Sequence, residues 1–449
     1  MTASITSPLP SQISPPPVVR TAVQPLSFPS RLDSILLYGA FSLLLFGPLA
    51  FGAVEWWSIF VMEAGATLLV LLWGIRQFLS NELHIIGHPL FPPMLLFAAL
   101  IAIQVTVRHT AYAYATVSAG LLYCAYAQYC FVVVQTLRHT RQLKTLAFIF
   151  SVYGFAMAAF AIIQGMSSNG KLYWLRTPRQ GGWIYGPYVN HNHYAGLMEM
   201  LVPIPLVFCL MRFARGPRRI VAAICAAIMA STIFLSGSRG GMVAFSVQMT
   251  ILASLLIIRR ASPKSIIALA LFLLAVAGLL AWVGGKQIPD RLATFNTESR
   301  AELSGGTRTA INRDGLKMFT RKPLLGWGLA VFPDVFPQFR TFYTNFFINN
   351  AHNDYLQLLA EMGALGFVTM LSFLIIVYRK CLAKIRNWTE NPNGAVAVSA
   401  LVGISGILVH SLVDSNLQIP ANAALFYVLC TIAAMEPRFS NPSRRATIH

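Results

Sequence analysis

The chain has 449 residues, of which 56% are hydrophobic and only 11% are charged, whereas an average soluble domain has about 25% charged residues. This composition excludes an ordinary soluble protein and predicts an integral membrane protein. The net charge of +19 does not predict a nucleic-acid partner, because the basic residues lie in short clusters between apolar runs and form no single basic face or stripe.

We expect the two ends of the chain to be tails outside the membrane domain. Residues 1–30 are rich in Pro, Ser and Thr and lack an apolar core followed by a small-residue cleavage site. This pattern predicts a disordered cytoplasmic tail and no cleaved signal peptide. A second cytoplasmic tail is expected at 436–449, so the transmembrane domain is expected to cover residues 31–435.

Apolar windows of about 20 residues predict twelve transmembrane helices with both chain ends on one side of the membrane. The windows are 34–54, 56–76, 89–107, 112–136, 145–166, 194–211, 220–236, 242–258, 265–283, 354–378, 396–412 and 421–435. Kinks are expected near Pro203, Pro205, Gly363 and Gly366. The predicted fold class is an all-α polytopic membrane protein with a long loop, 284–353, between the ninth and tenth helices.

The basic clusters between these windows fall on one side of the predicted bundle. They lie at residues 138–144, 212–219, 259–264, 379–386 and 438–445, and the positive-inside rule assigns their side to the cytoplasm. The opposite side receives loop 167–193, the turn at 237–241 and the long loop 284–353. We expect that side to be periplasmic or extracellular.

The long loop is rich in basic residues, although it falls on the side that the positive-inside rule normally leaves poor in them. These residues are Lys286, Arg291, Arg300, Arg308, Arg313, Lys317, Arg321, Lys322 and Arg340. For each of them the alternatives are a solvated surface position and a binding site for an anionic headgroup. Cations and an imidazole at a water–lipid boundary suit a substrate that joins phosphate to a lipid tail.

The turn Ser236-Gly-Ser-Arg239-Gly-Gly241 joins two apolar windows with almost no spacer. It places a guanidinium at the membrane surface beside glycines that let a ligand approach the backbone closely. A guanidinium can hold phosphate through two parallel hydrogen bonds, which a lysine cannot do. We therefore expect Arg239 to bind phosphate, and the alternative is an arginine that extends from a helix end into the headgroup region.

His352 directly precedes a predicted helix, and either Asn353 or Asp354 is expected to cap that helix. The imidazole can then lie beside free backbone N–H groups that favour an anion. A capping or packing role is the alternative for a lone histidine. The arginines of the same loop favour a functional role.

A polar stretch at 186–196 lies on the same predicted side. A helix is expected to begin near Asn192, so that Asn192 and Glu199 share one face. A carboxylate this deep in a span is expected to meet an arginine or to line a polar cavity. The neighbouring histidines, His191 and His193, have no third clustered ligand, so we predict no metal site.

A second polar stretch follows the eleventh window. His410 and Asp414 lie one helical turn apart there, and we expect a structural hydrogen bond between their side chains.

These motifs together resemble those of the bacterial O-antigen ligase and Wzy-type O-antigen polymerase superfamily. The resemblance covers roughly residues 180–425 and rests on Gly186-x3-Asn190-x-Asn192-x2-Ala195, Gly237-Ser-Arg239-Gly, Arg308 with Lys322-Pro323-Leu-Leu-Gly326-x-Gly328, Ala351-His352-Asn353-x-Tyr355-Leu-x2-Leu-x-Glu361-x-Gly363, and His410-x3-Asp414-x-Asn416-Leu-x-Ile-Pro420-Ala. Where many relatives have Trp four residues after the loop arginine, this chain has Asn312. Whether Arg308 or Arg313 matches that arginine is therefore open.

The resemblance implies a multi-pass glycosyltransferase of the bacterial inner membrane, which moves a glycan from an undecaprenyl-diphosphate carrier to an acceptor hydroxyl on the periplasmic side. It implies no nucleotide sugar, no metal and no other cofactor. The implied partners are the lipid-linked glycan donor, a saccharide or lipid-core acceptor, and membrane lipids. By motif, Arg239 and Arg308 match arginines that hold the diphosphate, and His352 matches the histidine near the acceptor.

The chemistry of these side chains agrees with the resemblance, because fixed guanidinium groups can stabilise a leaving diphosphate and an imidazole can act as general base. We expect His352, Arg239 and Arg308 to be catalytic. Substrate binding is expected to involve Asn190, Asn192, Arg313, Asn353, Asp354, Tyr355 and Glu361. Of these, Asp354 and Glu361 are also candidates for orienting a catalytic group.

Three alternatives differ from the ligase interpretation. A Wzy-type polymerase would use the same donor and leaving group, and no residue of the sequence identifies the acceptor. A solute transporter would suit twelve helices, but transporters place polar sites near the midplane and often contain repeats, whereas these motifs converge on one surface. A noncatalytic assembly partner would need none of the motifs.

Overall fold

A computed structural model of the protein describes residues 31–81, 83–177, 184–211, 216–259, 262–283, 305–345, 347–385 and 392–435. Several expectations lie outside the described residues: the tails 1–30 and 436–449, the first part of the long loop at 284–304 with Lys286, Arg291 and Arg300, and Arg212, Arg215, Arg260 and Arg386 of the basic clusters.

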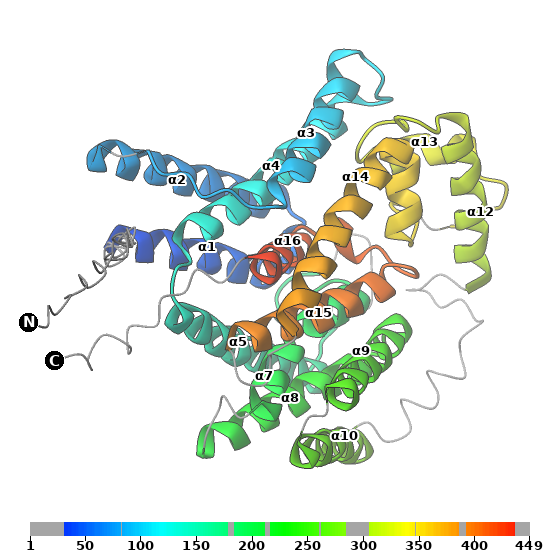
Figure 1. Ribbon diagram of the computed structural model, residues 1–449. Coiled ribbons are helices and arrows are strands. Elements are labelled where there is room, and N and C mark those ends of the chain that lie inside the picture. Colours follow the sequence, from blue (N-terminus) through cyan, green and yellow to red (C-terminus); the bar gives the residue numbers. More distant parts are fainter. Residues whose placement is uncertain are drawn as a thin grey trace, which may run out of the picture.

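The described part of the chain is all-α and contains no strand, only two isolated β-bridges (Figure 1). The elements in chain order are α1 (Arg31–Leu49), η1 (Phe51–Ala53), α2 (Trp56–Ser80), α3 (Phe91–Thr106), α4 (Ala113–Thr136), α5 (Thr140–Met166), α6 (His191–Leu201), α7 (Pro203–Leu210), α8 (Pro217–Leu235), α9 (Arg239–Ile258), α10 (Pro263–Val283), α12 (Gly305–Arg321), α13 (Phe332–Val335), η2 (Phe336–Gln338), α14 (Asp354–Lys384), α15 (Pro392–His410), η4 (Asn416–Gln418) and α16 (Pro420–Ala434).

Ten helical segments of the described chain are long and apolar enough to cross a membrane, with α6 and α7 forming one of them, and α3 and α16 are shorter apolar helices. The predicted class, an all-α polytopic membrane protein, is confirmed. Each predicted window corresponds to one of these segments, but the number of crossings and the position of the long loop stay predictions. Two expected kinks are present: α6 ends before Pro203, and Gly363 interrupts α14 with φ 65° and ψ −169°.

The helices α15 and α16 lie at the centre of the bundle (Figure 1). Every residue of α16 is buried, and α15 packs against α6, α7, α9 and α16. Helices in a bilayer gain little from hydrophobicity alone and associate through close packing, which small residues permit. Gly403 accordingly lies where an added Cβ would be 3.0 Å from the carbonyl oxygen of Met200, and Gly47 lies as close to the side chain of Ala421.

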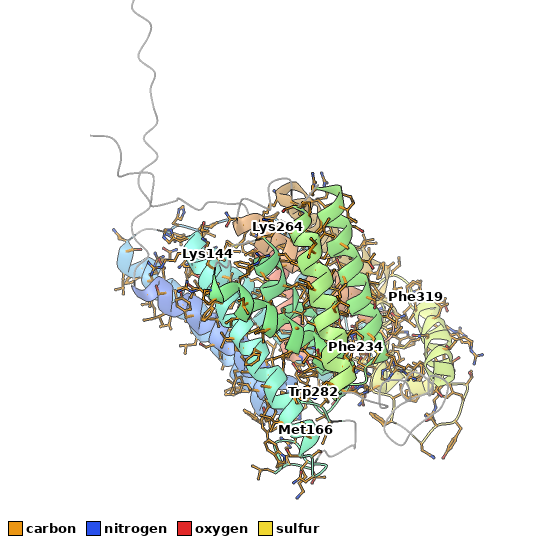
Figure 2. All side chains as sticks on the ribbon, turned by 90° about the horizontal axis from the view of Figure 1, so that it is seen from below. Lys144, Met166, Phe234, Lys264, Trp282 and Phe319 are labelled. Carbon is orange, nitrogen blue, oxygen red and sulfur yellow. The ribbon has the colours of Figure 1, made fainter. Side chains whose placement is uncertain are left out.

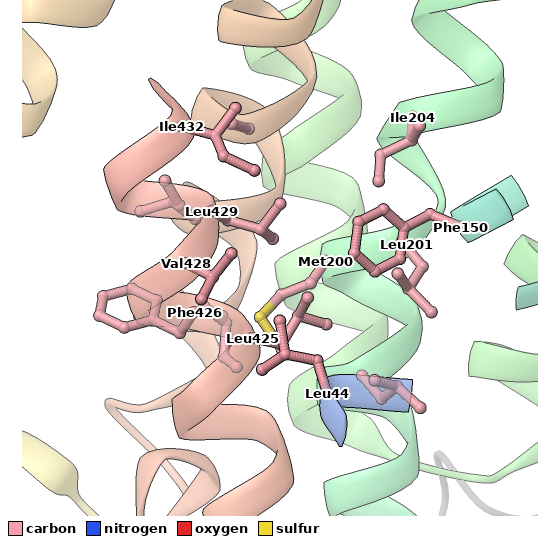
Figure 3. Packing of buried hydrophobic residues seen from close by; sticks show 14 of the residues in the cluster. Leu44, Phe150, Met200, Leu201, Ile204, Leu425, Phe426, Val428, Leu429 and Ile432 are labelled. Atoms are coloured by element: carbon pink, nitrogen blue, oxygen red, sulfur yellow. The ribbon is translucent and has the colours of Figure 1, made fainter. Parts of the chain in front are cut away.

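Apolar side chains fill the space between α16 and the α6–α7 segment (Figure 3). Leu425 and Leu429 of α16 lie across from Met200 and Leu201, and Ile432 lies across from Ile204. All of them are buried. Since Leu and Met fill such gaps in well-packed cores, these contacts fix α16 relative to α6. They thereby help to fix the start of α6, where the expected substrate-binding residues Asn190 and Asn192 lie.

The polar features of the chain gather at one end of the bundle. Figure 2 shows Lys144 and Lys264 at one end and Met166 and Trp282 at the other, so α5 and α10 run in the same direction. Loop 167–190 and the long loop therefore start at the same end. That this end faces the periplasm stays a prediction from the positive-inside rule.

Thiol labelling tests the predicted orientation. In a Cys124→Ala background, which removes the exposed native cysteine, a membrane-impermeant maleimide should label Met166→Cys in intact spheroplasts. It should label Lys264→Cys only after permeabilisation, because basic clusters are retained in the cytoplasm. Labelling of Lys264→Cys alone in intact spheroplasts would reverse the topology.

Candidate active site

His352 immediately precedes Asn353, the cap of α14, and its ring lies beside Asp414. Asn353 caps the helix, since its Oδ1 accepts hydrogen bonds from the N–H groups of Tyr355 and Leu356, both at 3.1 Å. Of the two expected caps, Asn353 is therefore the one that the structure confirms. His352 has φ 51°, an uncommon left-handed conformation for a residue with a side chain, and its Nδ1 lies 3.3 Å from Oδ1 of Asp414.

Asp414 is a buried anion with cationic groups around it. Its carboxyl is 1% exposed, and Oδ1 also accepts from the N–H of Ser415 at 2.8 Å. Burial alone raises the pKa of this carboxyl, but the hydrogen bond from His352 and the charge of Arg308 outweigh burial and hold the pKa well below its usual range. Asp414 is therefore ionised at neutral pH and can keep a proton on Nδ1 of His352.

Arg308 reaches the same loop from the first turn of α12. The buried face of α12 sets its direction, because Ile311 and Met318 pack with Phe332 in a small apolar cluster. Nη1 of Arg308 donates to the carbonyl of Val413 at 2.8 Å. The guanidinium thus lies one residue from the carboxylate that pairs with the imidazole.

Arg313 points elsewhere. It lies five residues after Arg308, so the two side chains are about 140° apart around α12. Nη2 of Arg313 donates to Oγ1 of Thr341 at 2.8 Å, Nε lies 3.6 Å from Asp314, and the side chain is 64% exposed. Of the two candidates for the loop arginine, the structure brings Arg308 to His352 and does not bring Arg313 there.

Arg239 is the first residue of α9, and the turn around it packs against the same loop. Ser238 caps α9, with Oγ accepting from the N–H of Gly241 at 3.1 Å. Gly240 fits closely: an added Cβ would lie 2.6 Å from Nε2 of His410 and 3.0 Å from a methyl of Val413. The 410–414 loop is therefore contacted by the guanidinium of Arg308 and by Gly240, the neighbour of Arg239.

His410 does not make the expected side-chain hydrogen bond to Asp414. Its Nδ1 lies 2.7 Å from Oε1 of Glu199 on α6, and its Nε2 lies 3.4 Å from Oγ of Ser238. Only the backbone joins it to Asp414, whose N–H donates to the carbonyl of His410. Glu199 is expected from the sequence to meet an arginine or to line a polar cavity. The hydrogen-bond partner of its carboxylate is His410 and not an arginine, and the polar cavity stays a prediction.

The start of α6 is fixed by a cap and by a hydrogen bond from α16. Asn190 caps the helix by accepting from the N–H of Asn192 at 2.8 Å, so α6 begins at His191, one residue before the expected position. The carbonyl of His193 accepts from Asn422 of α16 at 2.9 Å. Within the described residues, no three histidine, cysteine or acidic side chains come together in a way that could hold a metal ion.

Asp354 binds the loop after α15 and does not contact the imidazole. Its Oδ2 accepts from Oγ of Ser411 at 2.7 Å and from the N–H of Leu417 at 3.0 Å, and its Oδ1 accepts from Gln418 at 3.2 Å. Tyr355 donates its hydroxyl to the carbonyl of Leu408 at 2.8 Å. These contacts attach the N-terminal end of α14 to the segment that carries Asp414.

Glu361 binds the chain before α13. Its Oε2 accepts from the N–H of Ala330 at 2.8 Å, and its Oε1 accepts from the N–H of Phe332 and from Gln357, both at 3.1 Å. The side chain is 2% exposed. The orienting partner of His352 is therefore Asp414, and neither Asp354 nor Glu361 takes that place.

Residues 224–371 match a family model described as O-antigen ligase. The match confirms the resemblance to the O-antigen ligase and Wzy superfamily, and it includes Arg239, Arg308 and His352. It supports a membrane protein of the glycan ligase or polymerase type. No curated protein matches the chain.

Glu361 offers a test of the distinction between framework and substrate binding. Glu361→Ala should lower the thermal unfolding temperature in detergent, because two buried N–H groups lose their acceptor and each unpaired group costs about 1–3 kcal/mol. Glu361→Gln, which keeps one acceptor oxygen, should unfold at an intermediate temperature. A Glu361→Ala protein that unfolds like the wild type but binds no substrate would indicate a direct role instead.

Proposed function

We propose that the protein is a membrane glycosyltransferase of the O-antigen ligase type, which transfers a glycan from undecaprenyl diphosphate to an acceptor hydroxyl at the periplasmic face. One observation carries the proposal: a guanidinium and an imidazole meet on adjacent residues of one loop, Arg308 at the carbonyl of Val413 and His352 at the carboxylate of Asp414. The family match over residues 224–371 supports it.

The donor would be held through its diphosphate. Arg239 and Arg308 supply two positive charges, and each lies in the first turn of a helix, where the helix dipole adds to the attraction for an anion. As the bond between the anomeric carbon and the diphosphate oxygen breaks, negative charge grows on the leaving group. Fixed guanidinium groups stabilise that charge more than they stabilise the bound donor, which is how they lower the barrier.

The acceptor would be activated by His352. With a proton held on Nδ1 by Asp414, Nε2 carries a lone pair and can take the proton of the acceptor hydroxyl. The acceptor oxygen then forms its bond to the anomeric carbon, and the lipid diphosphate leaves. A single displacement of this kind inverts the anomeric centre.

The Wzy-type polymerase remains the second candidate, because it uses the same donor and leaving group. The two activities differ in the acceptor: a lipid-core sugar for a ligase, another lipid-linked repeat for a polymerase. Purified protein supplied with donor and with each acceptor in turn separates them by the product formed. Flux of solute into proteoliposomes without lipid-linked sugar would favour the transporter instead.

Single substitutions test the site. Arg239→Ala, Arg308→Ala and His352→Ala should each reduce transfer by about 10²-fold or more in an assay with purified lipid-linked donor, since each removes charge stabilisation or general-base catalysis.

Arg313→Ala is the matched control on the same helix, and it should retain transfer within about threefold because its partners lie away from His352. Wild-type transfer by Arg239→Ala or Arg308→Ala, or a loss confined to Arg313→Ala, would refute the proposed diphosphate clamp.

Asp414→Asn tests how the imidazole is oriented. An amide can donate to Nδ1 and so move the proton to Nε2, where it blocks general-base catalysis. We expect kcat to fall by about 10²-fold or more while KM for the donor changes little.

Asp334→Asn is the control, since Asp334 is an exposed aspartate on α13, and it should behave as the wild type. An equal fall in kcat for both variants, or a change in donor KM alone for Asp414→Asn, would contradict an orienting role.

A further inference from the structure

Glu199 and His410 form a buried pair that the proposed chemistry does not use. Their side chains are 0% and 1% exposed, and both belong to helical segments that are apolar enough to span a membrane. Glu199 is the ninth residue of α6, about 12 Å from the start of that helix. Ionisable groups at such depth are costly and generally have a functional reason, so the contacts of this pair identify what it does.

Three hydrogen bonds in series join Glu199 to the turn around Arg239, and one placement of the protons gives each of them a donor and an acceptor. The Nδ1–H of His410 donates to Oε1 of Glu199 at 2.7 Å, and the hydroxyl of Ser238 donates to Nε2 at 3.4 Å, the longest of the three links. Oγ of Ser238 in turn accepts from the N–H of Gly241 at 3.1 Å. Since Ser238 is the cap of α9, the pair reaches the residue that immediately precedes Arg239.

Packing independently joins the imidazole to the same turn. An added Cβ on Gly240 would lie 2.6 Å from both Cδ2 and Nε2 of the His410 ring, so the ring lies flush against the backbone of the turn. His410 also ends α15, and its carbonyl accepts from the N–H of Asp414 at 3.1 Å. The ring of His410 thus contacts the Arg239 turn, and His410 is also the first residue of the loop that Arg308 and His352 contact.

We propose that the Glu199–His410 pair is a positioning device that fixes the Ser238–Arg239 turn relative to the 410–414 loop, so that the two arginines are spaced to bind one diphosphate. This inference rests on the proposed function, because it assigns the pair to the donor side of that site. Glu199 and His410 act through Ser238 and do not touch the reacting atoms. Loss of the pair should therefore weaken diphosphate binding.

The test measures binding of farnesyl diphosphate to the full-length protein in detergent, because this probe carries a diphosphate and a short isoprenyl chain but no sugar to transfer. Ser238→Ala and Glu199→Leu should each raise the Kd for the probe by about tenfold or more. Ser238→Thr, which keeps the hydroxyl, and Glu199→Gln, which keeps an oxygen that accepts from Nδ1, should stay within about threefold of the wild type.

Gln248→Met is the matched control for general damage to the bundle. Gln248 is a buried polar residue of α9 that donates to the carbonyls of Glu199 and Val402, so it joins the same three helices about 13 Å below the turn. Its replacement should lower the thermal unfolding temperature and leave the Kd for the probe unchanged.

The outcomes separate this inference from the proposed function. If Arg239→Ala loses the probe while Ser238→Ala and Glu199→Leu bind it normally, the positioning role is refuted and the clamp stands. If the wild type itself does not bind the probe, the clamp fails and the positioning role fails with it. If Glu199→Leu does not fold, Ser238→Ala against Ser238→Thr decides, since both keep the buried pair.

Discussion

The candidate site depends on one buried charge, the carboxylate of Asp414. A carboxylate at 1% exposure would cost several kcal/mol if it were left unpaired, and here the hydrogen bond from His352 and the charge of Arg308 compensate for the lost water. Because those groups come from different elements, their attraction to this carboxylate holds the start of α12, the start of α14 and the end of α15 close together.

Three helix N-termini converge on the loop that carries this charge. Arg239 opens α9, Arg308 lies in the first turn of α12, and His352 lies two residues before α14. Each N-terminus contributes partial positive charge, so the region suits a ligand with more negative charge than Asp414 alone. A diphosphate has this charge, and such a ligand agrees with the glycan ligase or polymerase type of protein that the family match supports.

Three other buried carboxylates hold the framework around the site. Asp354 attaches α14 to the loop after α15, Glu361 holds the chain before α13, and Glu199 reaches the Arg239 turn through His410. All three accept hydrogen bonds that would otherwise be missing in a region with little water, which is the condition for keeping polar groups inside a membrane protein. Rigid placement of charge is what electrostatic catalysis requires.

The sequence by itself determined the class of protein, the apolar segments, a helix cap at Asn353 or Asp354 and the family resemblance, because hydropathy, capping and short motifs are local properties. It also selected Arg239, Arg308 and His352 as candidates. Only the tertiary structure placed Arg308 at Val413 and Arg313 at Thr341, paired His352 with Asp414, and gave His410 to Glu199 instead of to Asp414. The two histidines lie 62 and 211 residues from these partners along the chain, and helix packing, which no local pattern encodes, brings them within hydrogen-bonding distance.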